Sequence, residues 1–372
     1  MSGFRVIVAG GGVAGVEAML RLRRLAGDLL DVTLLAPGEE FAVRALSVRE
    51  PFAARGAERH ALADIAARCG GEWLPASVKW VDSARRVVHT DGAGQLAYDA
   101  LLLAPGARVV PAFEHATSFR DDRADELFGG IVRDVEGGYA SEGVAFLMPE
   151  GPTWRLPLYE LALMTAERAG GMGADLELSL VTPEPAPLAG YGDALSARLA
   201  DALDAAGVVV YTAASAQVPH AGHVLVQPHG LELRPRRVIA MPRVVGPALP
   251  GIPCGDVSGF IPIDAHCRVP GGDGRIFAAG DATAFPIKNG GLSAQQADTA
   301  AAGIARLAGV AGVEAGRFHP VLRGTLFTGG APLYFQSQIV AGQSFDSEVS
   351  DTPLWPAAQK VMAEEINAFL EQ

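Results

Sequence analysis

Three glycines near the start of the chain have the spacing of a phosphate-binding turn. Residues 10–15 read GGGVAG and lie between an apolar run and a helical pattern. In a strand–turn–helix unit, Gly10 permits the tight turn, Gly12 lets the backbone approach a pyrophosphate, and Gly15 lets helix and strand pack closely. The free amides and positive dipole end of the helix favour phosphate groups. The pattern therefore predicts a dinucleotide cradle.

An acidic residue is expected at the end of the second strand of such a unit, where it binds the ribose hydroxyls. Here the strand at 32–35 is followed by Ala36 and Pro37. Glu39 and Glu40 come next. They either reach back to the ribose or are solvated loop charges.

Two further segments combine buried strands with polar turns. Residues 98–107 read YDALLLAPGA, and residues 275–283 read RIFAAGDAT. A carboxylate at the C-terminal end of a parallel strand faces the ligand crevice, which makes Asp281 a candidate cofactor contact. The alternative is that Asp281 only caps a turn or a helix.

Together with the glycine turn, these segments have the order found in the FAD-dependent pyridine nucleotide–disulfide oxidoreductase superfamily, which the sequence resembles over about residues 4–310. Pro105 stands where that superfamily has a threonine. The segments LPLYELA (156–162) and PIKNGGLSAQQA (286–297) resemble its sulfide:quinone oxidoreductase and type II NADH dehydrogenase branch. The resemblance implies an α/β fold with two Rossmann-like dinucleotide-binding domains, the second inserted in the first.

The implied FAD-binding domain has two parts, residues 1–110 and 254–317. A second dinucleotide-type domain is expected at 111–253 and a C-terminal appendage at 318–372. FAD is the implied cofactor. The residues expected to contact it are Gly10, Gly12, Val13, Ala14, Gly15, Ala36, Glu39, Arg44, Val78 near the adenine, Ala104, Pro105, Gly106, Gly280, Asp281, Lys288, Gly291 and Leu292.

Arg44, Glu160 and Lys288 are expected around the flavin ring as catalytic groups. With the helix N-terminus that follows it, Lys288 would stabilise the negative charge of reduced flavin. Otherwise it is a surface lysine. Glu160 would relay protons with a pKa raised by burial. Otherwise it is an N-terminal helix glutamate that the dipole favours.

Two features of the superfamily are missing. Residues 36–60 contain no redox-active cysteine pair, and Cys254 and Cys267 do not match the cysteines of sulfide oxidation, so buried inert thiols are expected. The expected nucleotide loop of the second domain, 149–157, reads PEGPTWRLP, and the next strand ends at Pro183 without a ribose acid. Proline supplies no N–H, so the use of NAD(P)H is left open.

The composition of the chain excludes some classes of binding partner. The chain has 372 residues and a net charge of -12, with 42 acidic and 30 basic side chains, which argues against nucleic acid. Three scattered cysteines, no leader and no apolar run of ~18 residues predict a cytoplasmic protein without a transmembrane segment. His220, His223 and His229 are expected in solvated loops, with no metal bound. An acidic C-terminal helix near 356–370 indicates packing or homodimerisation, although a quinone reached from a membrane stays open.

Three functions are consistent with these residues. The first is a soluble FAD-dependent oxidoreductase that moves two electrons between the flavin and a small organic substrate or quinone. The second keeps the fold but takes electrons from NAD(P)H through a non-standard loop, and flavin reduction by NADH would discriminate it. The third is a non-catalytic protein with the flavin fold.

Overall fold

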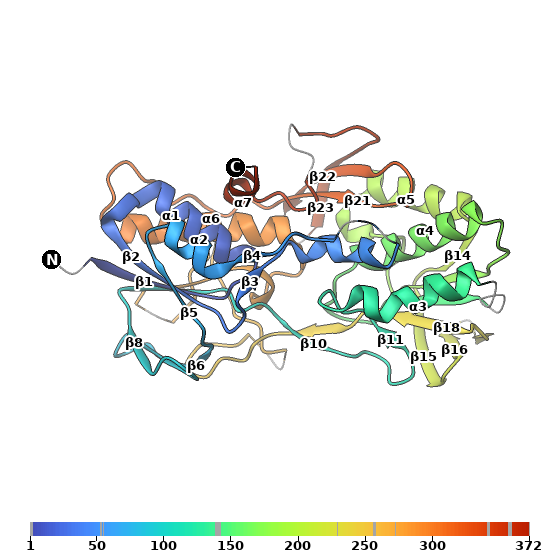
Figure 1. Cartoon of the computed structure of the whole chain (residues 1–372), viewed down its shortest axis with the longest axis horizontal. Coiled ribbons are helices and arrows are strands. Elements are labelled where there is room, and N and C mark those ends of the chain that lie inside the picture. Colours follow the sequence, from blue (N-terminus) through green and yellow to red (C-terminus); the bar gives the residue numbers. More distant parts are fainter. Residues whose placement is uncertain are drawn as a thin grey trace.

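The computed structural model describes residues 3–52, 54, 56–137, 143–228, 230–255, 258–271, 273–340, 343–355 and 359–371. Two five-stranded parallel sheets lie toward opposite ends of an elongated molecule (Figure 1). The predicted fold class, with two Rossmann-like sheets, is confirmed. No helix in the described ranges combines the length and apolar composition that crossing a membrane requires.

The first sheet has the strand order β20-β9-β1-β2-β5. Its strands are β1 (Phe4–Ala9), β2 (Leu30–Leu35), β5 (Glu72–Leu74), β9 (Ala100–Leu103) and β20 (Ile276–Ala278). Every residue of β9 and β20 is buried, as expected for parallel strands covered on both faces. One cover is formed by α1 (Val13–Ala26), α2 (Leu62–Arg68) and α6 (Gly290–Leu307), seen above the sheet in Figure 1. The other is the small antiparallel sheet of β6 (Val78–Asp82), β7 (Val87–Thr90) and β8 (Gln95–Ala97).

The second sheet has the order β11-β18-β12-β13-β14. Its strands are β11 (Thr117–Ser118), β12 (Val144–Leu147), β13 (Leu178–Val181), β14 (Val208–Tyr211) and β18 (Arg237–Ala240). Helices α3 (Ala124–Glu136), α4 (Leu156–Gly171) and α5 (Asp193–Ala205) pack on it, and β15 (Ser215–His220), β16 (His223–Gln227) and β17 (Leu231–Leu233) form a separate antiparallel sheet.

The chain passes between the two sheets as a paired ribbon. The outgoing strand β10 (Arg108–Val110) pairs antiparallel with the returning strand β19 (Arg243–Val245). A short pair, β3 (Glu40–Phe41) and β4 (His60–Ala61), flanks a 3-10 segment at Arg44–Phe52 that packs against α3 and α4. This segment therefore links the first sheet to the helices of the second.

The C-terminal part differs from the prediction. Instead of one helix near 356–370, it has an antiparallel sheet of β21 (Val321–Leu326), β22 (Leu333–Val340) and β23 (Gln343–Ser350), and a short helix α7 (Glu364–Leu370). Residues 356–358 lie outside the described residues. The sheet packs its apolar face on the second domain's core, and α7 packs on α1. The alternation of apolar residues in β22 is a strand signal that the sequence analysis missed.

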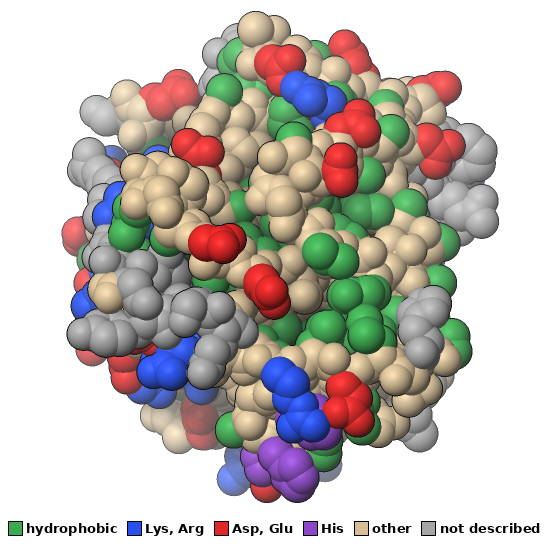
Figure 2. Space-filling model, turned by 90° about the vertical axis from the view of Figure 1, so that its right-hand side faces the viewer, with side chains coloured by type: hydrophobic (Ala, Val, Ile, Leu, Met, Phe, Trp, Pro, Cys, Tyr) green, Lys and Arg blue, Asp and Glu red, His purple; other side chains and the backbone are tan. Residues whose placement is uncertain are grey.

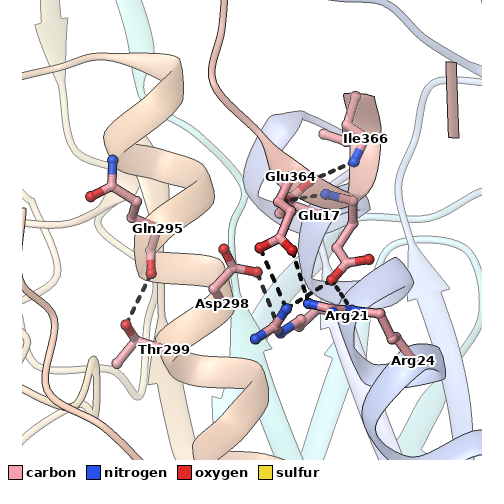
Figure 3. A network of polar contacts seen from close by, with 9 residues as sticks. Glu17, Arg21, Arg24, Gln295, Asp298, Thr299, Glu364 and Ile366 are labelled. Carbon is pink, nitrogen blue, oxygen red and sulfur yellow. Dashed lines mark hydrogen bonds and ion pairs between the residues drawn. The ribbon is translucent and has the colours of Figure 1, made fainter. Parts of the chain in front are cut away.

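A cluster of carboxylates fixes α7 against α1 and α6 (Figure 3). Glu17, fully buried on α1, accepts the backbone N–H groups of Glu365 at 2.9 Å and Ile366 at 2.8 Å. Arg21 pairs with the Glu365 carboxylate at 3.0 Å, and its Nε lies 3.9 Å from Asp298 of α6. Burial, reinforced by the neighbouring acids, raises the pKa of Glu17 to about 8 and that of Asp298 to about 7.

These raised pKa values predict a stability that falls with pH. The folded state holds protons that the unfolded chain releases at its ordinary carboxyl pKa, so stability is lost as pH rises toward 7–8. From pH 5 to pH 8 the wild type should lose stability that Asp298→Asn keeps. We expect the free energy of unfolding of the variant to rise by about 1–2 kcal/mol relative to that of the wild type over this range. Urea unfolding of both proteins at the two pH values measures this gain. The control is Asp201→Asn, an exposed site on α5. Parallel pH profiles for Asp298→Asn and wild type would contradict the prediction.

Candidate functional site

The three predicted motifs meet at the C-terminal edge of the first sheet. Gly10 has φ +136°, and a Cβ on it would lie 1.9 Å from the carbonyl oxygen of Ala104. A Cβ on Gly280 would lie 3.2 Å from Ala14 of α1 and 3.4 Å from the Ser293 hydroxyl of α6. Only glycine permits these approaches, so the turn after β1 packs on the segment after β9, and the segment after β20 packs on both helices.

The start of α1 leaves space for a ligand. Gly12 is the N-cap residue and is exposed; no side chain caps the helix, and its first turn holds no acid. A Cβ on Gly12 would meet nothing within 4 Å, whereas one on Gly15 would lie 1.7 Å from the Gly10 carbonyl oxygen. The first amides of α1, beginning at Val13 and Ala14, therefore face an open space with the positive dipole end behind them.

Among the described residues, no acidic side chain lies directly at the end of β2, where a ribose-binding acid is expected. Ala36 is buried, and its carbonyl accepts the Trp73 indole N–H at 3.1 Å. Glu39 and Glu40 are exposed, and Glu40 pairs with Arg59 at 3.2 Å. The rest of this rim consists of Val78, half-buried at the start of β6, with Pro105 exposed and Gly106 half-buried at φ +74° after β9.

Two opposite charges stand together after β20. Lys288 is buried, donates to the Thr283 carbonyl at 2.6 Å and lies 3.8 Å from the centre of the Phe260 ring. Burial lowers the pKa of Lys288 to about 8, while the Asp281 carboxylate opposes that fall. Burial also raises the pKa of Asp281, against the effects of a hydrogen bond from Trp154 and the charge of Lys288. Lys288 is therefore not the surface lysine of the alternative prediction.

The start of α6 is already capped. The Asn289 side chain accepts the N–H groups of Gly291 at 2.9 Å and Leu292 at 3.2 Å. These two amides are therefore engaged by Asn289, and the expected contacts of Gly291 and Leu292 with FAD stay predictions. The helix dipole still points at this site from behind Lys288.

Glu160 lies in a buried ion pair rather than at an exposed helix end. Its Oε1 accepts from the ammonium of Lys360 and, at 2.8 Å, from the Phe327 amide, while its Oε2 has no hydrogen-bond partner. Lys360 also donates to the Thr325 carbonyl at 2.7 Å. Burial raises the pKa of Glu160 and lowers that of Lys360, and the attraction within the pair opposes both shifts. The pair joins α4 to the C-terminal segment.

A pocket of about 290 Å³ is linked to this pair through Arg49 and the Phe327 ring. The ring of Phe327 connects the two features: Lys360 lies 4.3 Å from its centre and Arg49, which lines the pocket, lies 4.7 Å from it. The remaining lining residues are Val43, Leu46, Gly56, Glu58, His60 and Leu370. Arg44, predicted near the flavin ring, is largely exposed and lies 3.9 Å from Asp121. Arg49 is the arginine that the fold brings to Glu160, and sequence reasoning missed it.

An acid that the sequence analysis missed lies just beyond the end of β13 in the second sheet. Glu184 follows β13 and is buried. Its carboxylate accepts from the Tyr159 hydroxyl at 2.6 Å and from Arg155 at 2.8 Å, and lies 3.3 Å from the Thr182 hydroxyl. The acid is thus held by side chains of its own domain. Burial and the neighbouring Glu184 charge raise the pKa of Tyr159 well above its ordinary value, so Tyr159 stays a donor.

The loop after β12 reaches the first domain. The indole N–H of Trp154 donates to Asp281 Oδ2 at 2.7 Å. The two residues are 127 positions apart, and neither the composition nor the periodicity of the loop indicates this contact.

The cysteines and histidines are placed as follows. Cys69 and Cys267 are buried, and burial raises the pKa of both thiols, to about 11 for Cys69. Cys254 is exposed, which corrects the expectation of a buried thiol: it follows Pro253 in an irregular loop.

Figure 2 shows the end of the molecule formed by the second domain, where the visible histidines gather at the lower edge beside charged side chains. His223 lies 3.4 Å from Glu232, and His229 lies outside the described residues. Among described residues, no three potential ligands are grouped for a metal ion.

Comparison with known proteins agrees with this geometry. Residues 4–127 match the model of the family described as pyridine nucleotide-disulphide oxidoreductase. No curated protein matches the sequence. Among solved structures, the sulfide:quinone oxidoreductase of Aquifex aeolicus superposes with a TM-score of 0.78 at 20% identity, covering 93% of this chain and 86% of that one.

Two further structures share the fold. A ferredoxin reductase from Rhodopseudomonas palustris has a TM-score of 0.69 at 18% identity, covering 90% of this chain and 82% of that one. The NDH2 of Plasmodium falciparum, solved in complex with NADH, has a TM-score of 0.63 at 15% identity, covering 76% of this chain and 65% of that one. The match over residues 4–127 and the fold shared by nearly the whole chain agree with the resemblance to FAD-dependent oxidoreductases.

The residues present fit FAD. The uncapped start of α1 and the open space at Gly12 suit a pyrophosphate, whose charge the helix dipole favours. Asp281 stands beside this space, because the neighbouring Gly280 packs on Ala14. When bound, FAD supplies the two-electron chemistry, and the protein supplies orientation and electrostatics.

Proposed function

We propose that this protein is a cytoplasmic enzyme that passes two electrons between its flavin and a quinone or another small organic molecule, and that NAD(P)H is not its reductant. The observation that carries the proposal is the state of the second nucleotide site. A dinucleotide needs a glycine loop for its pyrophosphate and a carboxylate for its ribose. Here the loop has three prolines, and Glu184 is buried under Arg155 and Tyr159.

The pocket beside Arg49 supports an organic electron acceptor. Its lining is mainly apolar, with Arg49, Glu58 and His60 as polar groups, as is usual for small-molecule sites. Reducing a quinone to a quinol consumes two protons as well as two electrons. The neighbouring Glu160–Lys360 pair can hold a proton, because burial raises the pKa of Glu160 and lowers that of Lys360 toward neutrality. The pair is therefore our candidate proton source for this pocket.

The structural neighbours support the proposal without deciding it. The Aquifex aeolicus protein is named for sulfide and quinone, and the chain shares its fold along nearly its whole length. The cysteines of this chain do not indicate sulfide as donor: Cys69 and Cys267 are buried with raised pKa values. Three unpaired cysteines are consistent with a reducing compartment. The second candidate, an NAD(P)H-dependent reductase, is favoured by the likeness to NDH2 with bound NADH.

Anaerobic titration of the FAD-loaded protein tests the proposal. We expect the visible flavin band to stay oxidised with NADH and NADPH in excess, and to bleach with dithionite, which shows that the flavin is reducible. Adding a water-soluble short-chain quinone to the reduced protein should restore the band. Bleaching by one equivalent of NADH or NADPH would overturn the proposal in favour of the second candidate. A reduced flavin that the quinone reoxidises no faster than free reduced FAD would exclude the pocket's assigned role.

A further inference from the structure

The loop that carries Trp154 is held from several sides. The hydroxyl of Thr153, a buried residue, donates to the Pro242 carbonyl at 2.6 Å. The Pro152 carbonyl accepts the Val244 amide at 2.9 Å. Pro242 and Val244 belong to the segment that returns toward the first domain. The backbone of Trp154 therefore rests on a fixed support at the junction of the two domains.

From this support the Trp154 indole crosses to the FAD site. Its N–H can only donate, and it donates to Asp281 Oδ2 at 2.7 Å, a hydrogen bond to a carboxylate. The Asp281 turn in turn packs on the start of α1, because Gly280 lies against Ala14. One carboxylate oxygen is thus occupied by Trp154, and no hydrogen bond among the described residues engages the other.

We infer that Trp154 is a positioning residue for FAD: it fixes the orientation of the Asp281 carboxylate toward the cofactor. The loop that in a second nucleotide site would contact NAD(P)H here supports the first cofactor instead. The bond also favours the ionised form of Asp281, since it opposes the pKa rise that burial causes. This role concerns FAD binding alone, so it stands or falls independently of the electron donor proposed above.

The test is FAD affinity of the apoprotein, followed by flavin fluorescence. Trp154→Phe keeps a ring in the loop and removes only the donor. We expect it to bind FAD about 10- to 100-fold more weakly, the range of one hydrogen bond to a charged group. Trp355→Phe is the matched control, because the buried indole N–H of Trp355 has no hydrogen-bond partner among the described residues. It should bind FAD within about twofold of wild type.

A double-mutant cycle separates positioning from a general structural effect. In an Asp281→Asn background, Trp154→Phe should cost much less affinity than in the wild type, because the carboxylate that it orients is gone. Equal losses in both backgrounds, or a Trp154→Phe protein that binds FAD like Trp355→Phe, would overturn the inference.

If Trp154→Phe does not fold, a measurement on the wild-type protein still tests the inference. It has only four tryptophans, and the indole N–H signal of Trp154 can be assigned by elimination with Phe variants of the other three. We expect this signal to gain protection from hydrogen exchange when FAD binds. An indole signal that FAD leaves unchanged in position and in protection would contradict the inference.

Discussion

An aspartate at position 12 should abolish FAD binding while leaving the fold intact. Gly12 has ordinary extended backbone angles and is exposed, and a Cβ there would meet no protein atom within 4 Å. The new carboxylate would lie at the N-cap of α1, where aspartate stabilises a helix by a few tenths of a kcal/mol relative to glycine. It would also place a negative charge where the FAD pyrophosphate must approach. We expect the apoprotein to be at least as stable as wild type and its FAD affinity to fall at least about 100-fold.

Two measurements on the same samples check this prediction: FAD titration and thermal unfolding of the apoprotein. Gly170→Asp adds the same charge at an exposed position of α4 where a Cβ also meets nothing. Its FAD affinity should match wild type. The expected loss of about 100-fold corresponds to about 2.7 kcal/mol of binding free energy. A Gly12→Asp protein that binds FAD within about threefold of wild type would show that the cradle lies elsewhere. Unfolding of the variant in the absence of FAD would contradict the backbone argument.

Lys360→Met should destabilise the protein by about 3–5 kcal/mol, the usual cost of leaving a buried charge without its partner. Glu160 would keep only the Phe327 amide, and its pKa would rise further because the Lys360 charge no longer lowers it. Since a raised carboxyl pKa stabilises the folded state only where the group is protonated, the loss should be smaller at pH 5 than at pH 8. Urea unfolding of the apoprotein at both pH values measures it.

The double variant Glu160→Gln/Lys360→Met should recover most of the lost stability, because no buried charge remains. Lys79→Met is the matched control: Lys79 is exposed on β6, and its loss should change stability by no more than about 0.5 kcal/mol. If the double variant is as unstable as Lys360→Met, packing of the lysine stem rather than charge pairing is the cause. If the proton-source assignment holds, the double variant, although stable, should also reoxidise more slowly with a quinone.

The local parts of the site could be predicted because their reasons are local. The spacing of Gly10, Gly12 and Gly15 specifies a turn and an uncapped helix start, and the structure has both. Asp281 could be predicted in the same way, since it follows a buried parallel strand. The cap at the start of α6 also has a local reason, which the sequence analysis missed: Asn289 is a strong N-cap residue and accepts the N–H groups of Gly291 and Leu292.

The contacts that define the rest of the site join residues far apart in the chain. Lys360 lies 200 positions from Glu160, and Trp154 lies 127 positions from Asp281. Periodicity and composition describe neighbours along one element, so they could not indicate that Arg49 and Lys360 lie against the same Phe327 ring. That contact depends on how the 3-10 segment at Arg44–Phe52 packs between the two sheets.

The sequence alone thus determined the fold class, the glycine turn before α1 and the proline-rich loop after β12, because glycine spacing and missing N–H donors act through the local backbone. The tertiary structure decided which side chains complete the site. The sequence shows Glu184 after β13, but only the tertiary structure shows that Arg155 and Tyr159 donate hydrogen bonds to its carboxylate. Burial decided the rest: it converts Glu160, Lys360 and Lys288 from ordinary charged residues into groups with shifted pKa values.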